Sequence, residues 1–293
     1  MSDMMAGFGS GSVDSAGGGA ANGAGPAGGG QDLARDLGLA HVLADAADSI
    51  SLARFGAIDL QVDSKPDLTP VTDADRDVEQ AVRGLLAKAR PEDAILGEEY
   101  GGGLGSGRTW VIDPIDGTKN YVRGVPVWGT LIGLVAEGEA VLGLVSAPAL
   151  GQRWSGARGL GAWRGASLSS SAPIRVSSVS TLSDAFFSHS SPSGWAAQGR
   201  LDSFLALTRA VWRTRGFGDF WSYMLLAEGV LDIAAEPELA LHDMAACAAI
   251  VHEAGGIFTD TSGTHAGPFG ADALATNGLL HQAALEVLRG PSS

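Results

Sequence analysis

Two carboxylates, a glycine and a hydroxyl follow a short apolar run in the first half of the chain. The run, residues 110–112, predicts a buried strand, and Asp113 and Asp116 can both point into the space beyond its end. Gly117 lets the backbone come close to a bound group, and Thr118 opens the next segment. Carboxylates held together at a strand end repel one another unless a cation lies between them. A hard divalent cation such as magnesium, which prefers oxygen ligands, would remove that repulsion.

The end of this strand is predicted from Pro114, whose ring fixes φ and removes a hydrogen-bond donor from the ladder. We therefore expect the strand to stop at Asp113. A second interpretation stays open, because Asp-Pro and Asp-Gly pairs are common turn formers. The segment from Asp113 to Gly117 would then be a turn that binds nothing.

The composition describes a globular protein with a sizeable core. The chain has 293 residues, of which 45% are apolar and 18% are charged, enough for one large domain or two intimately packed domains. Its formal charge of −14 argues against a nucleic-acid surface, because phosphate backbones are bound chiefly by clustered lysine and arginine. An acidic protein that acts on an anionic substrate needs local compensation, which a bound metal would supply.

The single cysteine, Cys247, excludes an internal disulfide and predicts a free thiol in the core. This pattern suits the reducing cytoplasm. The sequence shows no secretion signal and no apolar run approaching about 18 residues. Neither secretion nor membrane insertion is therefore expected.

The first part of the chain is predicted to be a tail followed by an α+β unit. Residues 1–30 are rich in Gly, Ala and Ser and predict a disordered tail, and residues 31–172 predict helices packed on a largely antiparallel sheet. The expected helices are 32–55, with Leu39, Leu43, Ala46, Ile50 and Ala53 inward, and 73–89, with Val78, Val82, Leu85 and Ala89 inward. An extended loop spans 65–72, and strands are expected at 94–97, 127–135, 140–145, 153–157 and 161–164.

Residues 173–293 differ in the order of their predicted elements, because strands and helices alternate along the chain. Strands are expected at 185–188, 210–213, 231–235, 257–260 and 273–275, and helices at 194–207, 219–228, 243–254 and 279–288. Such alternation predicts a three-layer α/β unit.

Two acidic residues at helix starts have a purely structural explanation. Asp75 comes three residues after Thr72, so the pair can form a capping box. Asp243 begins a predicted helix, where a carboxylate stabilises the helix dipole. Capping is compatible with a further role at either position.

The segment 110–120 resembles the signature of the inositol monophosphatase superfamily, whose motif reads Asp-Pro-(Ile/Leu)-Asp-Gly-Thr. The resemblance extends upstream to residues 97–99 and downstream to 242–246, and it covers about residues 31 to 289. Segments 65–76, 119–126 and 223–229 look most like the bacterial histidinol-phosphate phosphatase branch. The resemblance implies a layered α-β-α-β-α sandwich in a magnesium-dependent phosphomonoesterase that is commonly a homodimer.

The resemblance also implies a set of site residues. The positions that match metal ligands in the family, where they hold two or three magnesium ions, are Glu98, Asp113, Asp116, Asp243 and the carbonyl of Ile115. Thr118, supported by Asp75 and Glu98, would position and deprotonate an attacking water. Backbone amides at Gly117 and Thr118 would contact the phosphate.

The expected reaction is hydrolysis of L-histidinol phosphate to L-histidinol and phosphate, a step of histidine biosynthesis. This small phosphomonoester carries an ammonium group and an imidazole, so its site should offer carboxylates that the metals do not use. Asp219 and Glu236 are the candidates: Asp219 lies just before a predicted helix, where it would also serve as an N-cap, and Glu236 ends a strand seven residues before Asp243.

The superfamily signature is also compatible with other functions. Other superfamily members hydrolyse inositol 1-phosphate or a 3′-phosphonucleotide. A non-catalytic metal- or phosphate-binding regulator is disfavoured, because a pure binder has no need of Thr118. One residue departs from the family pattern: His242 stands where many members have Trp, and we interpret it as a core residue or a neighbour of the ligands rather than as a ligand.

Overall fold

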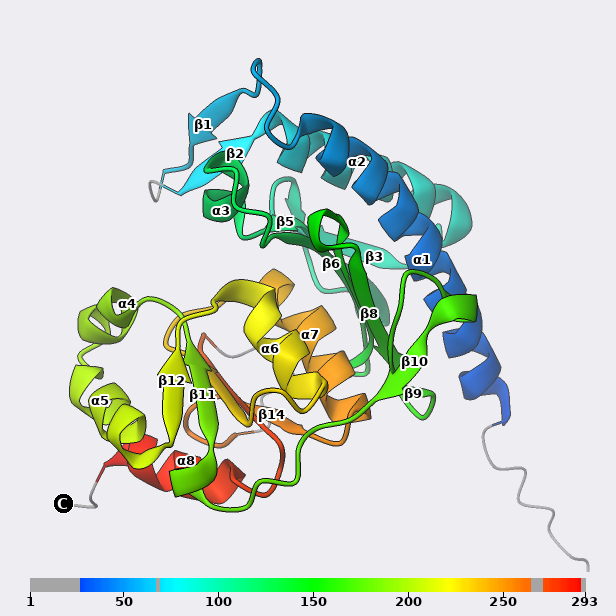
Figure 1. Ribbon diagram of the computed structural model, residues 1–293. Coiled ribbons are helices and arrows are strands. Elements are labelled where there is room, and N and C mark those ends of the chain that lie inside the picture. Colours follow the sequence, from blue (N-terminus) through cyan, green and yellow to red (C-terminus); the bar gives the residue numbers. More distant parts are fainter. Residues whose placement is uncertain (1–26, 67–68, 265–270, 291–293) are drawn as a thin grey trace, which may run out of the picture.

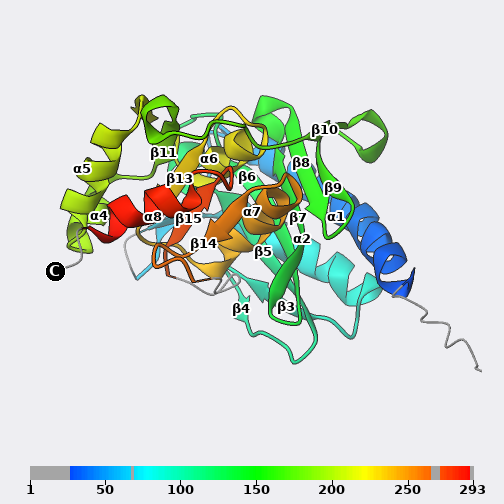
Figure 2. The same cartoon turned by 90° about the horizontal axis from the view of Figure 1, so that it is seen from below.

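The computed structural model of the chain describes residues 27–66, 69–264 and 271–290. They form five layers in the order helix, sheet, helix, sheet, helix (Figures 1 and 2). This arrangement confirms the predicted α-β-α-β-α sandwich. No helix among the described residues is both long enough and apolar enough to cross a membrane.

The first two layers are a helix pair and an eight-stranded sheet. Helices α1 (Ala27–Arg54) and α2 (Asp73–Ala89) cover one face of the sheet, with Val82 and Leu86 against Trp110 and Ile112. The strand order is β10-β9-β8-β7-β6-β5-β3-β4. The strands are β3 (Ala94–Gly97), β4 (Gly101–Gly102), β5 (Arg108–Asp116), β6 (Gly129–Ala136), β7 (Glu139–Ala147), β8 (Gln152–Ala157), β9 (Gly161–Arg164) and β10 (Ala172–Ile174).

The central layer consists of α6 (Asp219–Ala227) and α7 (Leu241–Glu253), which pack between the two sheets (Figure 1). Gly143 on β7 makes this packing close, because a Cβ there would lie 2.1 Å from the carbonyl oxygen of Ala246 on α7. Any larger residue would push α7 away from the sheet.

The last two layers are a five-stranded sheet and three helices. The strand order is β12-β11-β13-β15-β14, and β12, β11 and β13 run parallel. The outer helices cover this sheet through Trp195, Phe204 and Leu285, which pack against Phe187 and Ile233. The elements are β11 (Phe186–His189), β12 (Arg213–Arg215), β13 (Ile233–Glu236), β14 (Ile257–Thr259), β15 (Ala273–Thr276), α4 (Pro192–Ala197), α5 (Leu201–Ala210) and α8 (His281–Arg289).

Strand β5 does not stop at Asp113 as predicted but continues through Pro114 to Asp116. Its pairing with β6 shifts register between Asp113 and Asp116, and the Pro114 carbonyl accepts a hydrogen bond of 2.8 Å from the Thr130 hydroxyl. The expectation was wrong because a register shift lets a strand pass a residue that has no N–H to donate.

The inward face predicted for the first helix was also wrong. Leu43 is buried, but Ala53 is exposed and Leu39, Ala46 and Ile50 are half-buried. The apolar residues that are buried on this helix are Leu33, Leu37, Ala40, Leu43, Ala44 and Ala47. Both sets follow spacings of three and four, so periodicity alone could not choose between them.

Further element boundaries and one inward position differ from the predictions. Helix α1 begins at Ala27, inside the stretch predicted as a tail, whereas residues 1–26 lie outside the described residues. The helix predicted at 194–207 is two helices, α4 and α5, separated at Gly199, whose φ of 68° belongs to the left-handed region. On α2, Leu86 is buried in place of Ala89, which is exposed.

Candidate active site

Three aspartates from two distant segments meet between the first sheet and α7. Asp113 and Asp116 lie at the end of β5, and Asp243 lies in the first turn of α7. One carboxylate oxygen from each lies within 4.8 Å of the others. The close packing of α7 on the sheet is what brings Asp243 to β5.

The burial of these carboxylates makes the site electrostatically unfavourable without a cation. Burial raises the pKa of Asp113 well above its usual range, and the nearby Glu98, Asp116 and Asp243 raise it further. Burial also raises the pKa of Asp116 well above its usual range, and the nearby Asp219 and Asp243 raise it further. Asp113 Oδ1 is buried and has no hydrogen-bond partner among the described residues. An unpartnered carboxylate oxygen among other carboxylates fits an oxygen-preferring divalent cation.

Glu98 reaches the same region from the neighbouring strand. Strands β3 and β5 are parallel, and the Glu98 N–H donates to the carbonyl of Ile112 at 3.1 Å, so Glu98 follows β3 beside Asp113. Glu98 is not part of the group of three aspartates. Its Oε1 lies 2.7 Å from Lys65 Nζ, which is also 2.7 Å from Glu99 Oε1. The structure therefore places a lysine beside this predicted ligand.

Thr118, Ile115 and Asp75 form a compact hydrogen-bonding unit. The Thr118 hydroxyl lies 2.9 Å from the Ile115 carbonyl oxygen and 3.4 Å from Asp75 Oδ1. Since a hydroxyl has one proton to donate, these two acceptors compete for it. Asp75 also completes the capping box predicted with Thr72, so it has both of the contacts suggested for it.

Gly117 shapes the turn between β5 and α3 (Thr118–Val122). Its φ of 81° is in the left-handed region, and a Cβ at this position would lie 3.1 Å from Asp219 Oδ2. Glycine therefore allows α3 to begin beside both Asp116 and Asp219.

Asp219 and Glu236 lie close to the three aspartates. Asp219 is the first residue of α6, while the N-cap is Gly218, so the N-cap interpretation of Asp219 was wrong. Its φ of 47° is unusual for a residue other than glycine. Burial raises the pKa of Asp219, and Asp243 raises it further. The N–H of Phe220, the next residue, donates to Asp116 Oδ2 at 2.7 Å, which ties α6 to the end of β5.

Glu236 ends β13, as predicted, and is buried. The Tyr223 hydroxyl donates to Glu236 Oε1 at 2.9 Å. Burial, Asp219 and Asp243 raise the pKa of Glu236 to about 8, although hydrogen bonds from Tyr223 and Ser190 oppose the shift. A cation beside this carboxylate would favour its charged form.

His242 lies beside the cluster rather than in the core. Its Nε2 is 3.6 Å from Asp243 Oδ1, and its side chain is partly exposed. The alternative of a neighbour to the ligands therefore describes its position better than a core residue does.

Three residues of this region were missed in the sequence. Lys65 lies in the predicted loop, Tyr223 lies on α6, and Glu79 of α2 accepts hydrogen bonds from the backbone beyond Glu98. Each contacts a partner far away along the chain or on another element. No local spacing in the sequence signals such contacts.

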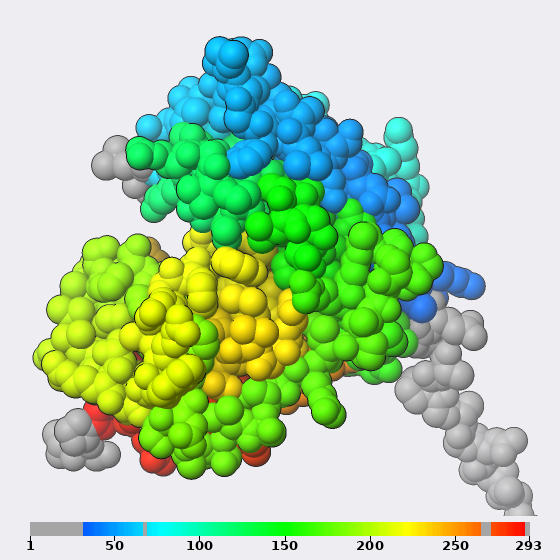
Figure 3. Space-filling model, viewed as in Figure 1, coloured from blue at the N-terminus to red at the C-terminus, as the bar shows by residue number. Residues whose placement is uncertain are grey.

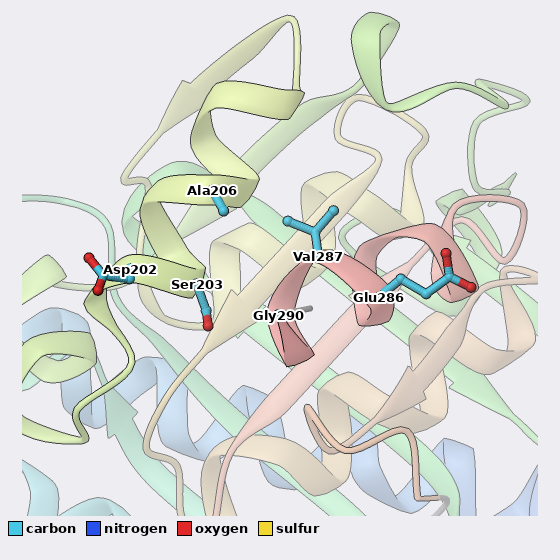
Figure 4. A pocket seen from close by; sticks show the side chains of 6 residues that line it. All are labelled: Asp202, Ser203, Ala206, Glu286, Val287 and Gly290. Atoms are coloured by element: carbon cyan, nitrogen blue, oxygen red, sulfur yellow. The ribbon is translucent and has the colours of Figure 1, made fainter. Parts of the chain in front are cut away.

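The surface of the protein has a notch beside α4 (Figure 3) and a separate hollow between α5 and α8. In the space-filling view, a notch separates the surface around α3 from that of α4 (Figure 3). This notch lies at the carboxyl end of β11, because α4 follows β11 directly. A hollow of about 400 Å³ between α5 and α8 is lined by Asp202, Ser203, Ala206, Glu286, Val287 and Gly290 (Figure 4). None of the predicted site residues lines it.

Comparison with known proteins agrees with this arrangement. The histidinol-phosphatase of Streptomyces coelicolor is 58% identical over 88% of this chain and 98% of its own length. That of Mycobacterium tuberculosis is 56% identical over 85% of this chain and 96% of its own length. The solved structure of an inositol monophosphatase from Zymomonas mobilis, 34% identical, superposes with a TM-score of 0.77 over 87% of this chain and 98% of that one. The sequence matches the inositol monophosphatase family over residues 33–290, and the chain therefore belongs to this family.

Proposed function

We propose that this protein is a magnesium-dependent phosphomonoesterase that hydrolyses L-histidinol phosphate. The observation that carries the substrate is a pair of carboxylates, the half-buried Asp219 and the buried Glu236, beside the group formed by Asp113, Asp116 and Asp243. They exceed what metal binding requires and suit a substrate with a positive charge beyond its phosphate. The names of the relatives from Streptomyces coelicolor and Mycobacterium tuberculosis point to the same substrate.

Magnesium would be held by Asp113, Asp116 and Asp243, with Glu98 and the Ile115 carbonyl as further ligands. When bound, it would supply positive charge against the phosphate and the leaving oxygen and lower the pKa of a water. The buried, unpartnered Asp113 Oδ1 supports this assignment.

The chain's own groups would orient and deprotonate the water. In this proposal Thr118 holds the attacking water and passes a proton toward Asp75, whose Oδ1 lies 3.4 Å from the Thr118 hydroxyl. Use of the Ile115 carbonyl as a ligand would make it a weaker acceptor and so favour donation from the hydroxyl to Asp75. The amides of Gly117 and Thr118 would contact phosphate oxygens.

The remainder of the substrate would lie against Asp219 and Glu236. A charge-assisted hydrogen bond to the substrate ammonium would satisfy Glu236, which Tyr223 already orients. Inositol 1-phosphate presents neutral hydroxyls and would leave these carboxylates without a cationic partner.

A substrate panel tests the assignment. Phosphate release by the purified protein should be fastest with histidinol phosphate among histidinol phosphate, inositol 1-phosphate and a 3′-phosphonucleotide. Asp219→Asn or Glu236→Gln should lower kcat/KM for histidinol phosphate by about ten- to a hundredfold, which corresponds to about 1.5 to 3 kcal/mol for a charged hydrogen bond. Activity on a small uncharged phosphomonoester should fall much less.

A control variant separates substrate binding from packing. Asp232 precedes β13 at the end opposite Glu236, is buried, and accepts from the Phe186 N–H at 2.7 Å. Asp232→Asn should destabilise the protein without changing the preference among substrates. A wild-type preference for inositol 1-phosphate, or equal losses on charged and uncharged substrates in both site variants, would contradict the histidinol assignment.

The setting of this activity is also proposed. We place the enzyme in the cytoplasm, which suits Cys247 as a buried free thiol. The family resemblance implies a homodimer, which sedimentation of the purified protein would test.

A further inference from the structure

Helix α2 presents three polar residues on one face, at spacings of four. Asp75, in its first turn, lies beside Thr118, while Glu79 and Arg83 follow one and two turns later. Residues four apart lie above one another on a helix, so the three form one row. Asp75 and Glu79 are both fully buried. Asp75 and Glu79 therefore face the interior beside the proposed site, and Arg83 lies at its edge, partly exposed.

Glu79 holds the backbone that follows Glu98. Its Oε2 accepts from the Glu99 N–H at 2.7 Å, and its Oε1 accepts from the Tyr100 N–H at 3.2 Å. Gly97, just before Glu98, touches the same carboxylate so closely that a Cβ there would lie 1.8 Å from Glu79 Oε1. The residues on both sides of Glu98 are thus fixed against one buried side chain.

Arg83 completes this connection. Its Nε donates to Glu79 Oε1 at 2.7 Å, and its guanidinium also contacts the carbonyl of Gly101 at the start of β4. The guanidinium balances the buried charge of Glu79 and holds the far end of the turn between β3 and β4. Helix α2 and this turn are therefore joined by charged and backbone hydrogen bonds.

From these contacts the structure assigns Glu79 as a positioning residue for the metal centre. It acts through the backbone on Glu98 and has no contact of its own with the three aspartates. This inference rests on the proposed function only in that Glu98 contributes to magnesium binding. Loss of Glu79 leaves Glu98 present but free to move away from Asp113.

Glu79→Gln tests the assignment, because an amide of the same shape has one acceptor oxygen instead of two. The NH₂ group of the amide must then lie against an N–H group that the carboxylate accepted from, so two donors oppose each other. The contact with Arg83 also ceases to be an ion pair. Calorimetric titration of Mg²⁺ into the full-length protein should show affinity weakened by about tenfold or more, about 1.4 kcal/mol. The kcat at saturating Mg²⁺ should stay close to the wild-type value.

The matched control is Asp36→Asn. Asp36 is also a buried carboxylate, paired with Arg90 and Arg108 at 2.7 Å, but Arg108 begins β5 whereas the aspartates end it. This variant should lower Tm and leave Mg²⁺ affinity unchanged. If Glu79→Gln does not fold, Arg83→Met, whose side chain is partly exposed, should show a weaker loss of Mg²⁺ affinity in the same direction.

The outcomes separate the two proposals. If the wild-type protein binds Mg²⁺ and Glu79→Gln binds it with the same affinity, the positioning role is overturned and the proposed function stands. Where Glu79→Gln does not fold, the same result with Arg83→Met has the same meaning. An equal loss of Mg²⁺ affinity in Asp36→Asn would also overturn it, because the effect would then be one of general stability. Absence of Mg²⁺ binding by the wild-type protein would overturn the metal centre and the positioning role together.

Discussion

Removing one carboxylate from the aspartate group should stabilise the protein without metal and abolish its activity with metal. Asp113→Asn is the sharpest such change, because Asp113 is buried and its Oδ1 has no hydrogen-bond partner in the part of the chain that the structure describes. Two like charges at the 4.8 Å limit of the group repel by about 3.5 kcal/mol at an effective dielectric constant of about 20. Proton uptake relieves part of this repulsion, so we expect a gain of about 1 to 3 kcal/mol in the free energy of unfolding.

The pH dependence follows from the raised pKa of these carboxylates. A carboxyl group whose pKa is raised on folding stabilises the folded state fully below its unfolded pKa of about 3.9 and loses that contribution as pH rises through the folded pKa. Metal-free wild-type protein should therefore be less stable at about pH 8 than at about pH 5. Asp113→Asn should reduce that difference.

Thermal unfolding with a chelator and with excess Mg²⁺ measures both effects. At about pH 8 with chelator, Tm should rise by about 2 to 4 °C per kcal/mol gained. Added Mg²⁺ should raise the wild-type Tm much more than that of the variant, and phosphate release by Asp113→Asn should be lost. A lower Tm of the variant in chelator, or near wild-type activity at ordinary Mg²⁺, would refute the reasoning.

Two further predictions concern Asp75 and the N-terminal segment. Burial, with Glu99 and Glu98, raises the pKa of Asp75 to about 6. The wild-type rate relative to that of Asp75→Asn should therefore rise as pH increases through about 6. Rates of both proteins measured against pH at saturating Mg²⁺ test this, and parallel profiles would exclude Asp75 as the proton acceptor. Deletion of residues 1–26 should leave Tm and turnover unchanged, because a Gly-rich sequence has too little apolar area to offset its ordering entropy; a large loss of either would show that the segment docks.

The elements that the sequence predicted best are those with chemical signals at their ends. Helix α2 runs from Asp73 to Ala89 as expected, because the capping box of Thr72 and Asp75 marks its start and Pro91 follows its end. The hairpin of β6 and β7 was also predicted, and its turn residues Glu137 and Gly138 have φ of 55° and 79°. These signals depend on a few neighbouring residues.

The errors arose where several local solutions fit the same residues. Helix α1 carries apolar residues on more than one face, and only its packing on β7 and on α2 selects the face that is buried. Pro114 is compatible with a strand that shifts register as well as with a strand end. In each case the tertiary contacts decided between alternatives that local preferences left nearly equal in free energy.

The active site shows the same division between what a segment specifies and what its surroundings specify. Helical spacing alone aligns Asp75, Glu79 and Arg83, but it does not say what they face. That depends on the parallel pairing of β3 with β5, which places the turn after Gly97 against α2 and Glu98 beside Asp113. The carboxylates that would hold a metal are therefore positioned by hydrogen bonds and packing that stabilise the fold. These interactions must offset the mutual repulsion of the carboxylates whenever the cation is removed.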